Sequence, residues 1–285
     1  MSAAHPQSAA PTIVTTDLGG LFLFQGAGAN VVAMPGDGGA LLIDGGLAAN
    51  ADALLGAVRA ATGNERVRML INTHWHPEQV GANETVGRMG GVILAHEKTQ
   101  MYLSNTVYSM TGKGRLEPIA PLPEAGRPGE LARGDGSIEF AGMRVDYGYL
   151  PQAHTDGDLY VHFPGLNVLV AGGVVSGDRW PLLDYRNGAW LGGRVRALEW
   201  LAELVDSDTR VVPADGRPLT GRDIVRQRDI YRALFETMIE YMNRGFGPED
   251  AVEHNPLAEY GAEYGDPSTF LDGAYRSMLI AYVPD

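Results

Sequence analysis

Two histidines separated by one residue carry the clearest chemical signal in the chain. They stand in the segment Thr73-His74-Trp75-His76-Pro77-Glu78-Gln79, directly after an apolar run at 67–71. In an extended segment, residues i and i+2 point to the same side, so His74 and His76 can converge on one metal ion while Trp75 faces away. The pair is only suggestive by itself. Its place at the end of a buried strand is where α/β proteins hold ligands.

Composition limits the chemistry and the partners of the chain. Its 285 residues are 45% apolar and 20% charged, which predicts one elaborated domain with a full core. The net charge of −13 argues against binding to nucleic acid or to an anionic membrane surface, and a small-molecule substrate is expected instead. No run of about 18 apolar residues occurs, so no membrane span is predicted. Because cysteine is absent, histidine and carboxylates are the strong metal ligands that remain.

Hydrophobic periodicity predicts the elements that must position these histidines. Strands are expected at 12–16, 21–25, 30–34, 40–44, 69–72 and 92–95, with helices at 48–61 and 82–89. After a Pro/Gly-rich passage from Ser104 to Gly136, strands are expected at 137–140, 144–149, 159–163, 168–171 and 210–212, with a helix at 189–205. Two such halves fit two sheets packed face to face with outer helices. The long passage is a lid or substrate-facing loop, or a surface insertion.

Both ends of the chain differ from this pattern. Residues 1–11 are expected to be a disordered lead-in without a signal peptide, which fits a cytoplasmic protein or a periplasmic one whose export signal has been removed. A helical extension at 218–285, packed on the main domain of 12–217, begins at a capping-box pattern, Thr220-x-x-Asp223. Its apolar stripe is Ile224, Tyr231, Leu234, Phe235, Met238 and Met242. We expect this stripe to pack in the core, with a homodimer face as the alternative.

Further motifs extend the histidine pair. The segment Gln152-Ala153-His154-Thr155-Asp156-Gly157-Asp158 lies between two predicted strands, and Leu42-Ile43-Asp44-Gly45-Gly46 lies upstream. Together with His74-Trp75-His76, they resemble the metallo-β-lactamase superfamily of metal-dependent hydrolases over about residues 12 to 217. The resemblance implies an α/β fold, an αββα four-layer sandwich with the metal at one edge of the two sheets, to which this chain adds C-terminal helices.

The resemblance implies a complete first metal site made by His74, His76 and His154. Three neutral imidazoles leave a fourth position for water, which is the open arrangement of a catalytic zinc site. One divalent ion is therefore expected, with zinc favoured over iron or manganese. Asp44 matches the buried aspartate behind the metal in the family, where it would support ligand-bearing backbone through hydrogen bonds. A turn residue before Gly45 is the alternative.

The chain departs from the family pattern at each position of the second metal site. The departures are Glu78 for an aspartate, Gln79 for a histidine, Gly173 for the metal-bridging aspartate and Asp215 for a histidine. Glu78 and Asp215 alone would form an oxygen-only site that suits zinc poorly. A mononuclear site is therefore expected, with Glu78 or Asp215 as the catalytic group that orients or deprotonates water.

Substrate contacts are expected from the loop after the strand at 168–171, namely Arg179, Trp180 and Tyr185. Ordinary packing of the loop is the alternative for these three residues. Trp75 and Tyr108 are similar, weaker candidates. Asp156 and Asp158 are expected to shape the turn beside His154.

Three functions remain open on these grounds. The favoured one is metal-dependent hydrolysis of a small ester, thioester, lactone or lactam. A non-hydrolytic binding or sensing protein that retains the fold and one metal is the main alternative, because the second-site ligands are lost. Redox chemistry at an iron held by the same histidines is the third. Fold alone does not choose among them.

Overall fold

The computed structural model describes residues 11–110 and 116–281, and its first half forms a seven-stranded sheet. The sheet contains β1 (Val14–Asp17), β2 (Phe22–Gln25), β3 (Val31–Met34), β4 (Ala40–Ile43), β5 (Val67–Ile71), β6 (Val92–His96) and β9 (Glu130–Ala132), in that order. The strands β1 to β4 form the predicted antiparallel meander. The pairs from β4 through β5 and β6 to β9 are parallel, so their carboxyl ends meet at one edge.

The second half forms a six-stranded sheet. Its strands, in order, are β10 (Gly136–Phe140), β11 (Met143–Leu150), β12 (Asp158–Phe163), β13 (Val168–Gly172), β14 (Arg210–Pro213) and β15 (Leu219–Thr220). Only β13 and β14 pair in parallel, across the helix α5 (Leu191–Leu204). Leu159 N–H in β12 donates to the carbonyl of Thr73, which ties this sheet to the segment that carries the first two histidines.

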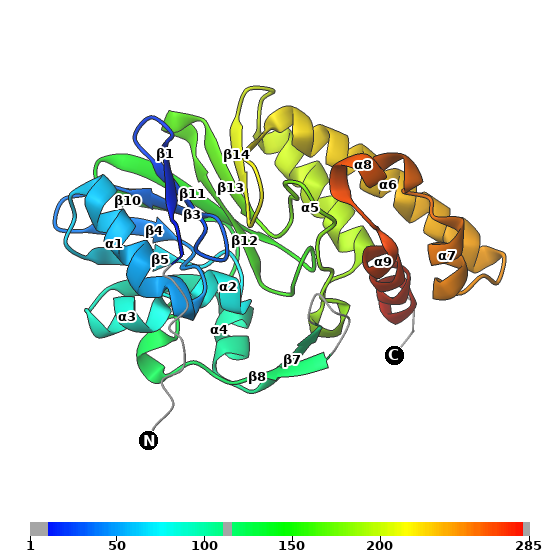
Figure 1. The fold of residues 1–285 in the computed structure, drawn as a ribbon, viewed down its shortest axis with the longest axis horizontal. Coiled ribbons are helices and arrows are strands. Elements are labelled where there is room, and N and C mark those ends of the chain that lie inside the picture. Colours follow the sequence, from blue (N-terminus) through cyan, green and yellow to red (C-terminus); the bar gives the residue numbers. More distant parts are fainter. Residues whose placement is uncertain (1–10, 111–115, 282–285) are drawn as a thin grey trace, which may run out of the picture.

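Helices cover the outer faces of both sheets, as Figure 1 shows. The first sheet packs against α1 (Ala51–Thr62) and α3 (Asn83–Arg88), and the short helices α2 (Pro77–Val80) and α4 (Glu97–Leu103) follow β5 and β6. Between the sheets, buried Leu41, Ile71 and Leu94 meet Val161 and Val170. The predicted αββα sandwich is confirmed, because each sheet buries one face against the other and one face under helices.

The passage from Ser104 to Gly136 is more regular than the sequence suggests. A hairpin pairs β7 (Val107–Met110) with β8 (Leu116–Ile119), and β9 adds an edge strand to the first sheet. The expectation of an irregular loop is therefore wrong for these strands. Backbone pairing overrides the weak local signal of a Pro- and Gly-rich segment.

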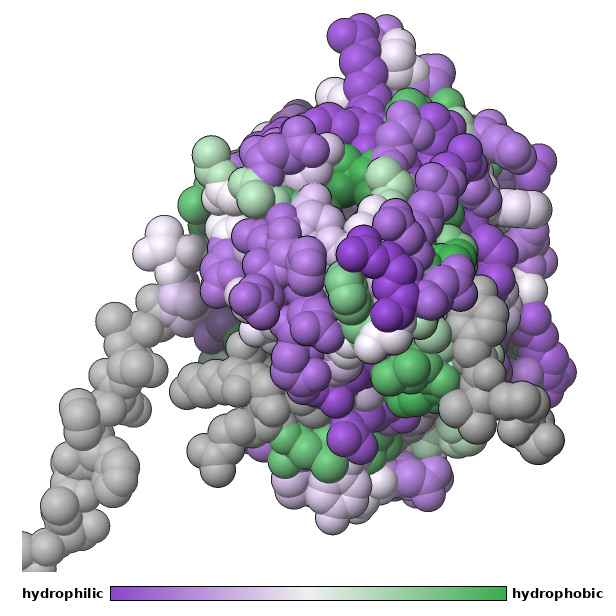
Figure 2. Space-filling view, turned by 90° about the vertical axis from the view of Figure 1, so that its right-hand side faces the viewer, coloured by the Kyte–Doolittle hydropathy of each residue, from purple (hydrophilic) through white to green (hydrophobic). Residues whose placement is uncertain are grey.

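The C-terminal helices pack on the second sheet. They are α6 (Gly221–Asn243), α7 (Pro248–His254), α8 (Gly261–Tyr264) and α9 (Ser268–Ala281). From the predicted stripe, Ile224, Tyr231, Leu234 and Met238 are fully buried in one core with α5, and Phe235 and Met242 pack against it. Figure 2, which views this side of the molecule, shows mainly hydrophilic residues between separate hydrophobic patches. The stripe thus has an intramolecular partner, so it no longer argues for a homodimer.

Among the described residues, no helix combines the length and apolar character that a membrane crossing requires. The predicted lead-in falls mostly on residues 1–10, which lie outside the described part of the chain.

Candidate metal centre

Three buried histidines meet where the two sheets come together. His74 and His76 follow β5, and His154 lies in the connection between β11 and β12. The rings stand edge to face, with centroids 4.7 to 4.9 Å apart and interplanar angles of 83 to 87°. Their exposed fractions are 1%, 3% and 6%. The three imidazoles thus lie close together and are shielded from water, and their nitrogens face one shared point.

The donor atoms fit a divalent ion. One ring nitrogen from each histidine lies within 4.8 Å of the others, and His154 Nε2 is 3.2 Å from His76 Nδ1. Zinc–nitrogen bonds of about 2.0–2.1 Å at tetrahedral angles separate ligand atoms by about 3.3 Å. Burial and the neighbouring histidines hold the pKa of His74 well below its ordinary value, and burial does the same for the pKa of His154. Both rings are therefore neutral, as metal ligation requires.

Asp184 orients His76 from the side away from the other histidines. Its carboxylate is fully buried, and its Oδ2 lies 3.1 Å from His76 Nε2. Ser109 Oγ donates to the same oxygen, and the Asn187 side-chain amide donates to both oxygens. Burial alone would lower the pKa of His76, but the Asp184 hydrogen bond and nearby Glu78 raise it above its ordinary value. With Nε2 held by Asp184, Nδ1 remains to face the metal.

Asp44 orients His74 through one intervening residue. Its carboxylate accepts from the Thr73 backbone N–H at 2.7 Å and from the Thr73 hydroxyl at 2.8 Å. The Thr73 oxygen is 3.0 Å from His74 Nδ1, so His74 Nδ1–H can donate to it and leave Nε2 for the metal. The backbone of Asp44 is left-handed, with φ 64°, which turns the chain away from β4. Asp44 lies where the sequence places it, behind the histidine segment.

Two other carboxylates shape the turn that carries His154. Asp158 is buried and accepts from the backbone N–H groups of His154 and Thr155 and from the Thr155 hydroxyl. Asp156 pairs with Lys98 at 2.7 Å and accepts from the Tyr149 hydroxyl. Both aspartates therefore hold the loop, as expected from the sequence.

The second metal site of the family pattern is sterically altered. A Cβ on Gly173 would lie 2.2 to 2.5 Å from the His154 ring, so no side chain fits there while His154 keeps its place. Gln79 is buried beside the histidines, and its Oε1 finds no hydrogen-bond donor among the described residues. The Asp215 carboxylate forms an ion pair with Arg179. Among the described residues, the group of histidines and carboxylates placed to hold a metal ion is His74, His76 and His154.

A pocket of about 860 Å³ opens onto the three histidines. It is lined by the predicted catalytic residues Glu78 and Asp215 and by the predicted substrate-contact residues Arg179, Trp180 and Tyr185. The structure thus brings these five side chains to the histidine site, although they come from three separate parts of the sequence.

Trp75 does not belong to this pocket. It is fully buried in a small cluster with Val80, Leu103 and Val107, and it stacks on Tyr102 at 5.0 Å. The expectation that Trp75 contacts substrate is therefore wrong. The alternation that directs the two histidines inward directs the residue between them into the opposite core.

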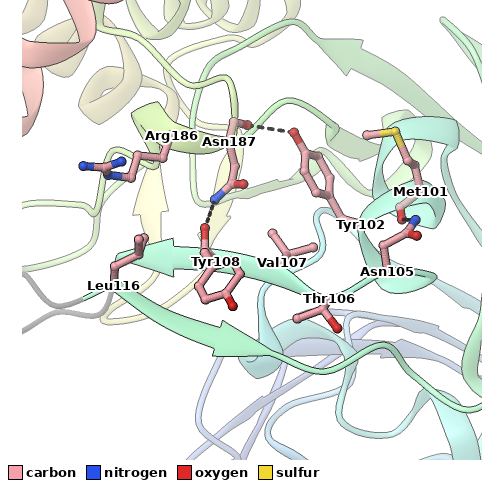
Figure 3. Close-up of a pocket in the computed structure, with 9 residues that line it drawn as sticks. All are labelled: Met101, Tyr102, Asn105, Thr106, Val107, Tyr108, Leu116, Arg186 and Asn187. Atoms are coloured by element: carbon pink, nitrogen blue, oxygen red, sulfur yellow. Dashed lines mark hydrogen bonds between the residues drawn. The ribbon is translucent and has the colours of Figure 1, made fainter.

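Tyr108 lies in a different pocket, between α4 and the β7–β8 hairpin (Figure 3). Figure 3 shows Asn187 between two tyrosines: its side-chain amide donates to the Tyr108 carbonyl at 3.0 Å, and its own carbonyl accepts from the Tyr102 hydroxyl at 3.2 Å. Since Asn187 and Ser109 also hold Asp184, the hairpin is hydrogen-bonded to the support of His76.

Sequence reasoning did not single out Asp184 or Arg194. Arg194 of α5 is fully buried, and its guanidinium donates to the Gly173 carbonyl at 3.0 Å and to Ser176 Oγ at 3.2 Å. It fixes the backbone that passes behind His154. Asp184 is 108 residues from His76 and belongs to no spacing pattern, so the sequence carried no signal for it.

An αββα sandwich with a three-histidine centre at the junction of its sheets defines a class of metal-binding α/β proteins. The model of the metallo-beta-lactamase superfamily matches residues 26–217, and the chain belongs to this superfamily.

One relative of known activity matches the chain in sequence. A linear primary-alkylsulfatase from Pseudomonas sp. (strain ATCC 19151) is 22% identical over 238 residues, which are 70% of this chain and 44% of that protein. This chain therefore spans less than half of the length of that curated relative.

Solved structures show the same fold. A metallo-beta-lactamase from Pontibacter korlensis superposes with a TM-score of 0.62 and 18% identity, covering 78% of this chain and 99% of its own. The sec-alkylsulfatase Pisa1 from Pseudomonas sp. superposes with a TM-score of 0.67 and 15% identity, covering 91% of this chain and 49% of its own. The match with Pisa1 leaves only a small part of this chain uncovered. Residues 218–285 are more numerous than the uncovered residues, so the match includes part of the C-terminal helices.

Proposed function

We propose that this chain is a metal-dependent hydrolase that uses a mononuclear three-histidine site to activate water against a small ester, thioester, lactone or lactam. The observation that carries the proposal is the convergence of His74, His76 and His154 on one point at the base of an 860 Å³ pocket. When bound there, a divalent ion polarises a substrate oxygen and lowers the pKa of a coordinated water to about 7. Zinc suits this nitrogen donor set best, with iron or manganese as alternatives.

The lack of space around Gly173 is an argument for a single metal ion. The bridging carboxylate of a two-metal site would have to occupy the space of the His154 ring. Gln79 and the ion-paired Asp215 are also poor replacements for histidine ligands.

Glu78 is the better of the two candidate bases. It lines the pocket in the first turn of α2, immediately after His76 and Pro77, and it has no hydrogen-bond partner among the described residues. Asp215 is engaged by Arg179. We therefore assign proton transfer to Glu78 and the positioning of Arg179 to Asp215.

Two measurements test this proposal together. Metal analysis of protein purified without added metal is expected to give one ion per chain, and two tightly held zinc ions would contradict the mononuclear site. A screen of esters, thioesters, lactones and lactams is expected to find hydrolysis in at least one class, abolished in His76→Ala. Glu78→Gln is expected to retain the metal and to lower kcat by about 10²- to 10⁴-fold.

A binding or sensing protein is the second candidate. The ion pair between Arg179 and Asp215 favours it, because the pair engages one of the two carboxylates that stand at family ligand positions. Metal-loaded protein that binds a ligand in this pocket but hydrolyses no member of any class would establish this function in place of catalysis.

A further inference from the structure

The pocket at the histidines has a second end, built by the C-terminal helices. Val252 of α7, Tyr264 of α8 and Phe270 of α9 line it together with Trp180. Val252, Tyr264 and Phe270 lie beyond the part of the chain that matches the superfamily model, whereas Trp180 lies within it. The extension therefore contributes directly to whatever part of a substrate projects away from the metal.

The side chains at this end form an aromatic wall, defined here as Trp180, Tyr264 and Phe270. The Trp180 ring stacks on Phe270 with centroids 5.6 Å apart at 10°, and its centroid is 4.8 Å from that of Tyr264. The Trp180 indole N–H donates to the Gly265 carbonyl at 3.1 Å, which fixes the ring. Tyr264 and Phe270 are almost fully buried, while Trp180 remains partly exposed. A fixed, partly exposed aromatic surface favours an apolar group.

The charges around this wall are mostly negative. Four carboxylates line the pocket, those of Glu78, Asp215, Asp266 and Asp272, against the single guanidinium of Arg179 among the described lining residues. That guanidinium is paired with Asp215. Asp272 is paired with Arg276, and Asp266 accepts hydrogen bonds only from Ser268. No unpaired cation among the described residues lining the pocket is therefore available to hold an anionic group at this end.

From these observations we infer that the pocket accepts neutral esters or lactones with an apolar acyl group, which lies on the aromatic wall, and that it discriminates against substrates with a negative charge at that end. The inference rests on the proposed hydrolysis and specifies its substrate class. An apolar tail gains by leaving water for the wall, whereas an anionic tail would lose hydration beside Asp266, whose carboxylate has no cationic partner among the described residues.

A matched pair of substrates tests the charge. The p-nitrophenyl ester of hexanoic acid and the mono-p-nitrophenyl ester of adipic acid have six-carbon acyl chains that differ in a terminal methyl or carboxylate. We expect kcat/KM to be at least tenfold higher for the hexanoate ester with the metal-loaded protein. Equal values, or a preference for the adipate ester, would overturn the inference while leaving hydrolysis established.

Substitutions at the wall end of the pocket test which residues cause the preference for an uncharged acyl chain. Asp266→Asn retains the acceptor for Ser268 and removes one charge, so it is expected to raise the relative kcat/KM for the adipate ester about twofold to fivefold. Asp178→Asn, at an exposed carboxylate that does not line the pocket, is the matched control and should leave the ratio unchanged. An unchanged ratio in Asp266→Asn would contradict the role given to the charge.

Esters with acyl chains of different length test the role of the aromatic wall. Trp180→Ala should lower kcat/KM for the hexanoate ester far more than for the acetate ester, and Trp180→Phe, which retains an aromatic ring, should restore most of the difference. Equal losses on both esters in a folded Trp180→Ala protein would count against the wall.

Binding to metal-free protein separates this inference from catalysis. Octanol and 8-hydroxyoctanoate share a hydroxyl head and an eight-carbon chain and differ in a terminal methyl or carboxylate, and calorimetric titration is expected to show tighter binding of octanol. If no ester is hydrolysed but octanol still binds preferentially, the proposed function fails and the pocket preference stands. If 8-hydroxyoctanoate binds as well as octanol, the preference fails.

Discussion

At the scale of single residues, two carboxylates fix the orientation of the histidines. Asp184 holds His76 directly, and Asp44 holds His74 through Thr73. Each leaves a different ring nitrogen for the metal, Nδ1 of His76 and Nε2 of His74. Orientation in the metal-free protein reduces the entropy that would otherwise be lost on binding.

Substitution of Asp184 tests this support. Asp184→Ala is expected to weaken metal affinity by about 10- to 100-fold, because His76 loses the partner that sets its tautomer and ring position. Competition with a chromophoric chelator measures the affinity. Asp178→Asn, a change in the same loop at an exposed site, is the control. Unchanged affinity in Asp184→Ala would show that packing alone positions His76.

The stability of the metal-free protein should depend on Asp44. Burial raises its pKa to about 8, against the hydrogen bonds from Thr73 that lower it. The folded protein therefore retains a proton that the unfolded chain releases near pH 4, so this contribution to stability is fully present below pH 4 and is lost as the pH rises through 8. Between these two pH values, the contribution of Asp44 to the free energy of unfolding falls with a slope that approaches about 1.4 kcal/mol per pH unit.

Urea denaturation between pH 5 and pH 8 measures this slope. Asp44→Asn cannot titrate, and asparagine tolerates the left-handed backbone at this position, so the difference in stability between the wild type and this variant should change with pH by that slope. The pKa values of Asp158, His74 and His154 are also shifted, but these groups titrate in both proteins and cancel in the difference. Asp52→Asn, at an exposed carboxylate in α1, should keep the wild-type pH dependence. Parallel curves for the wild type and Asp44→Asn would mean that the pKa of Asp44 is not raised.

At the scale of elements, local sequence patterns predicted the long helices but missed some of the strands. The helices α1, α5 and α6 follow apolar periodicities, as the sequence predicts, and α1 ends at Gly63 in the left-handed conformation. The strands β7 and β8 were not anticipated because their Pro- and Gly-rich passage carries only a weak strand signal, and β9 was not anticipated because it pairs with β6, which lies well before it in the chain. The hairpin also reaches the metal centre through Ser109 and Asp184, a link that no local pattern encodes.

The capping box of α6 is an element that the sequence predicted correctly. Thr220 and Asp223 are hydrogen-bonded at the start of this 23-residue helix. Thr220→Ala is expected to lower the free energy of unfolding by about 1 kcal/mol, since a helix N–H loses its acceptor. Thr237→Ala, at a half-buried site in the interior of the same helix, should have little effect or stabilise slightly. Thermal or urea denaturation compares the two, and equal effects would argue against the cap.

At the scale of the whole molecule, the C-terminal helices belong to the core and to the pocket. Leu234, Met238, Phe270 and Met278 share one buried cluster with Leu198 of α5. The extension is thus an outer layer of the sandwich, in the place where the second sheet needs cover.

A chain that ends at Thr220 tests this integration. It would expose the apolar face of α5 and the second sheet, so we expect aggregation or loss of cooperative unfolding. Removal of residues 1–10, predicted from the sequence to be a lead-in, should leave the unfolding transition unchanged. Circular dichroism and size-exclusion chromatography report both. A soluble, cooperatively folding protein that ends at Thr220 would show that the extension is an independent addition.

The sequence by itself determined the layered fold, the histidine pair and the resemblance that added His154, because periodicity and spacing are local properties of the chain. Only the tertiary structure decided that Trp75 lies in a core, that Gly173 excludes a side chain beside His154 and that Asp184 supports His76. It also placed the aromatic wall in the same pocket as the histidines. These features depend on which distant segments pack together. The free energy of that packing comes from contacts throughout the core, so no local stretch of sequence determines it.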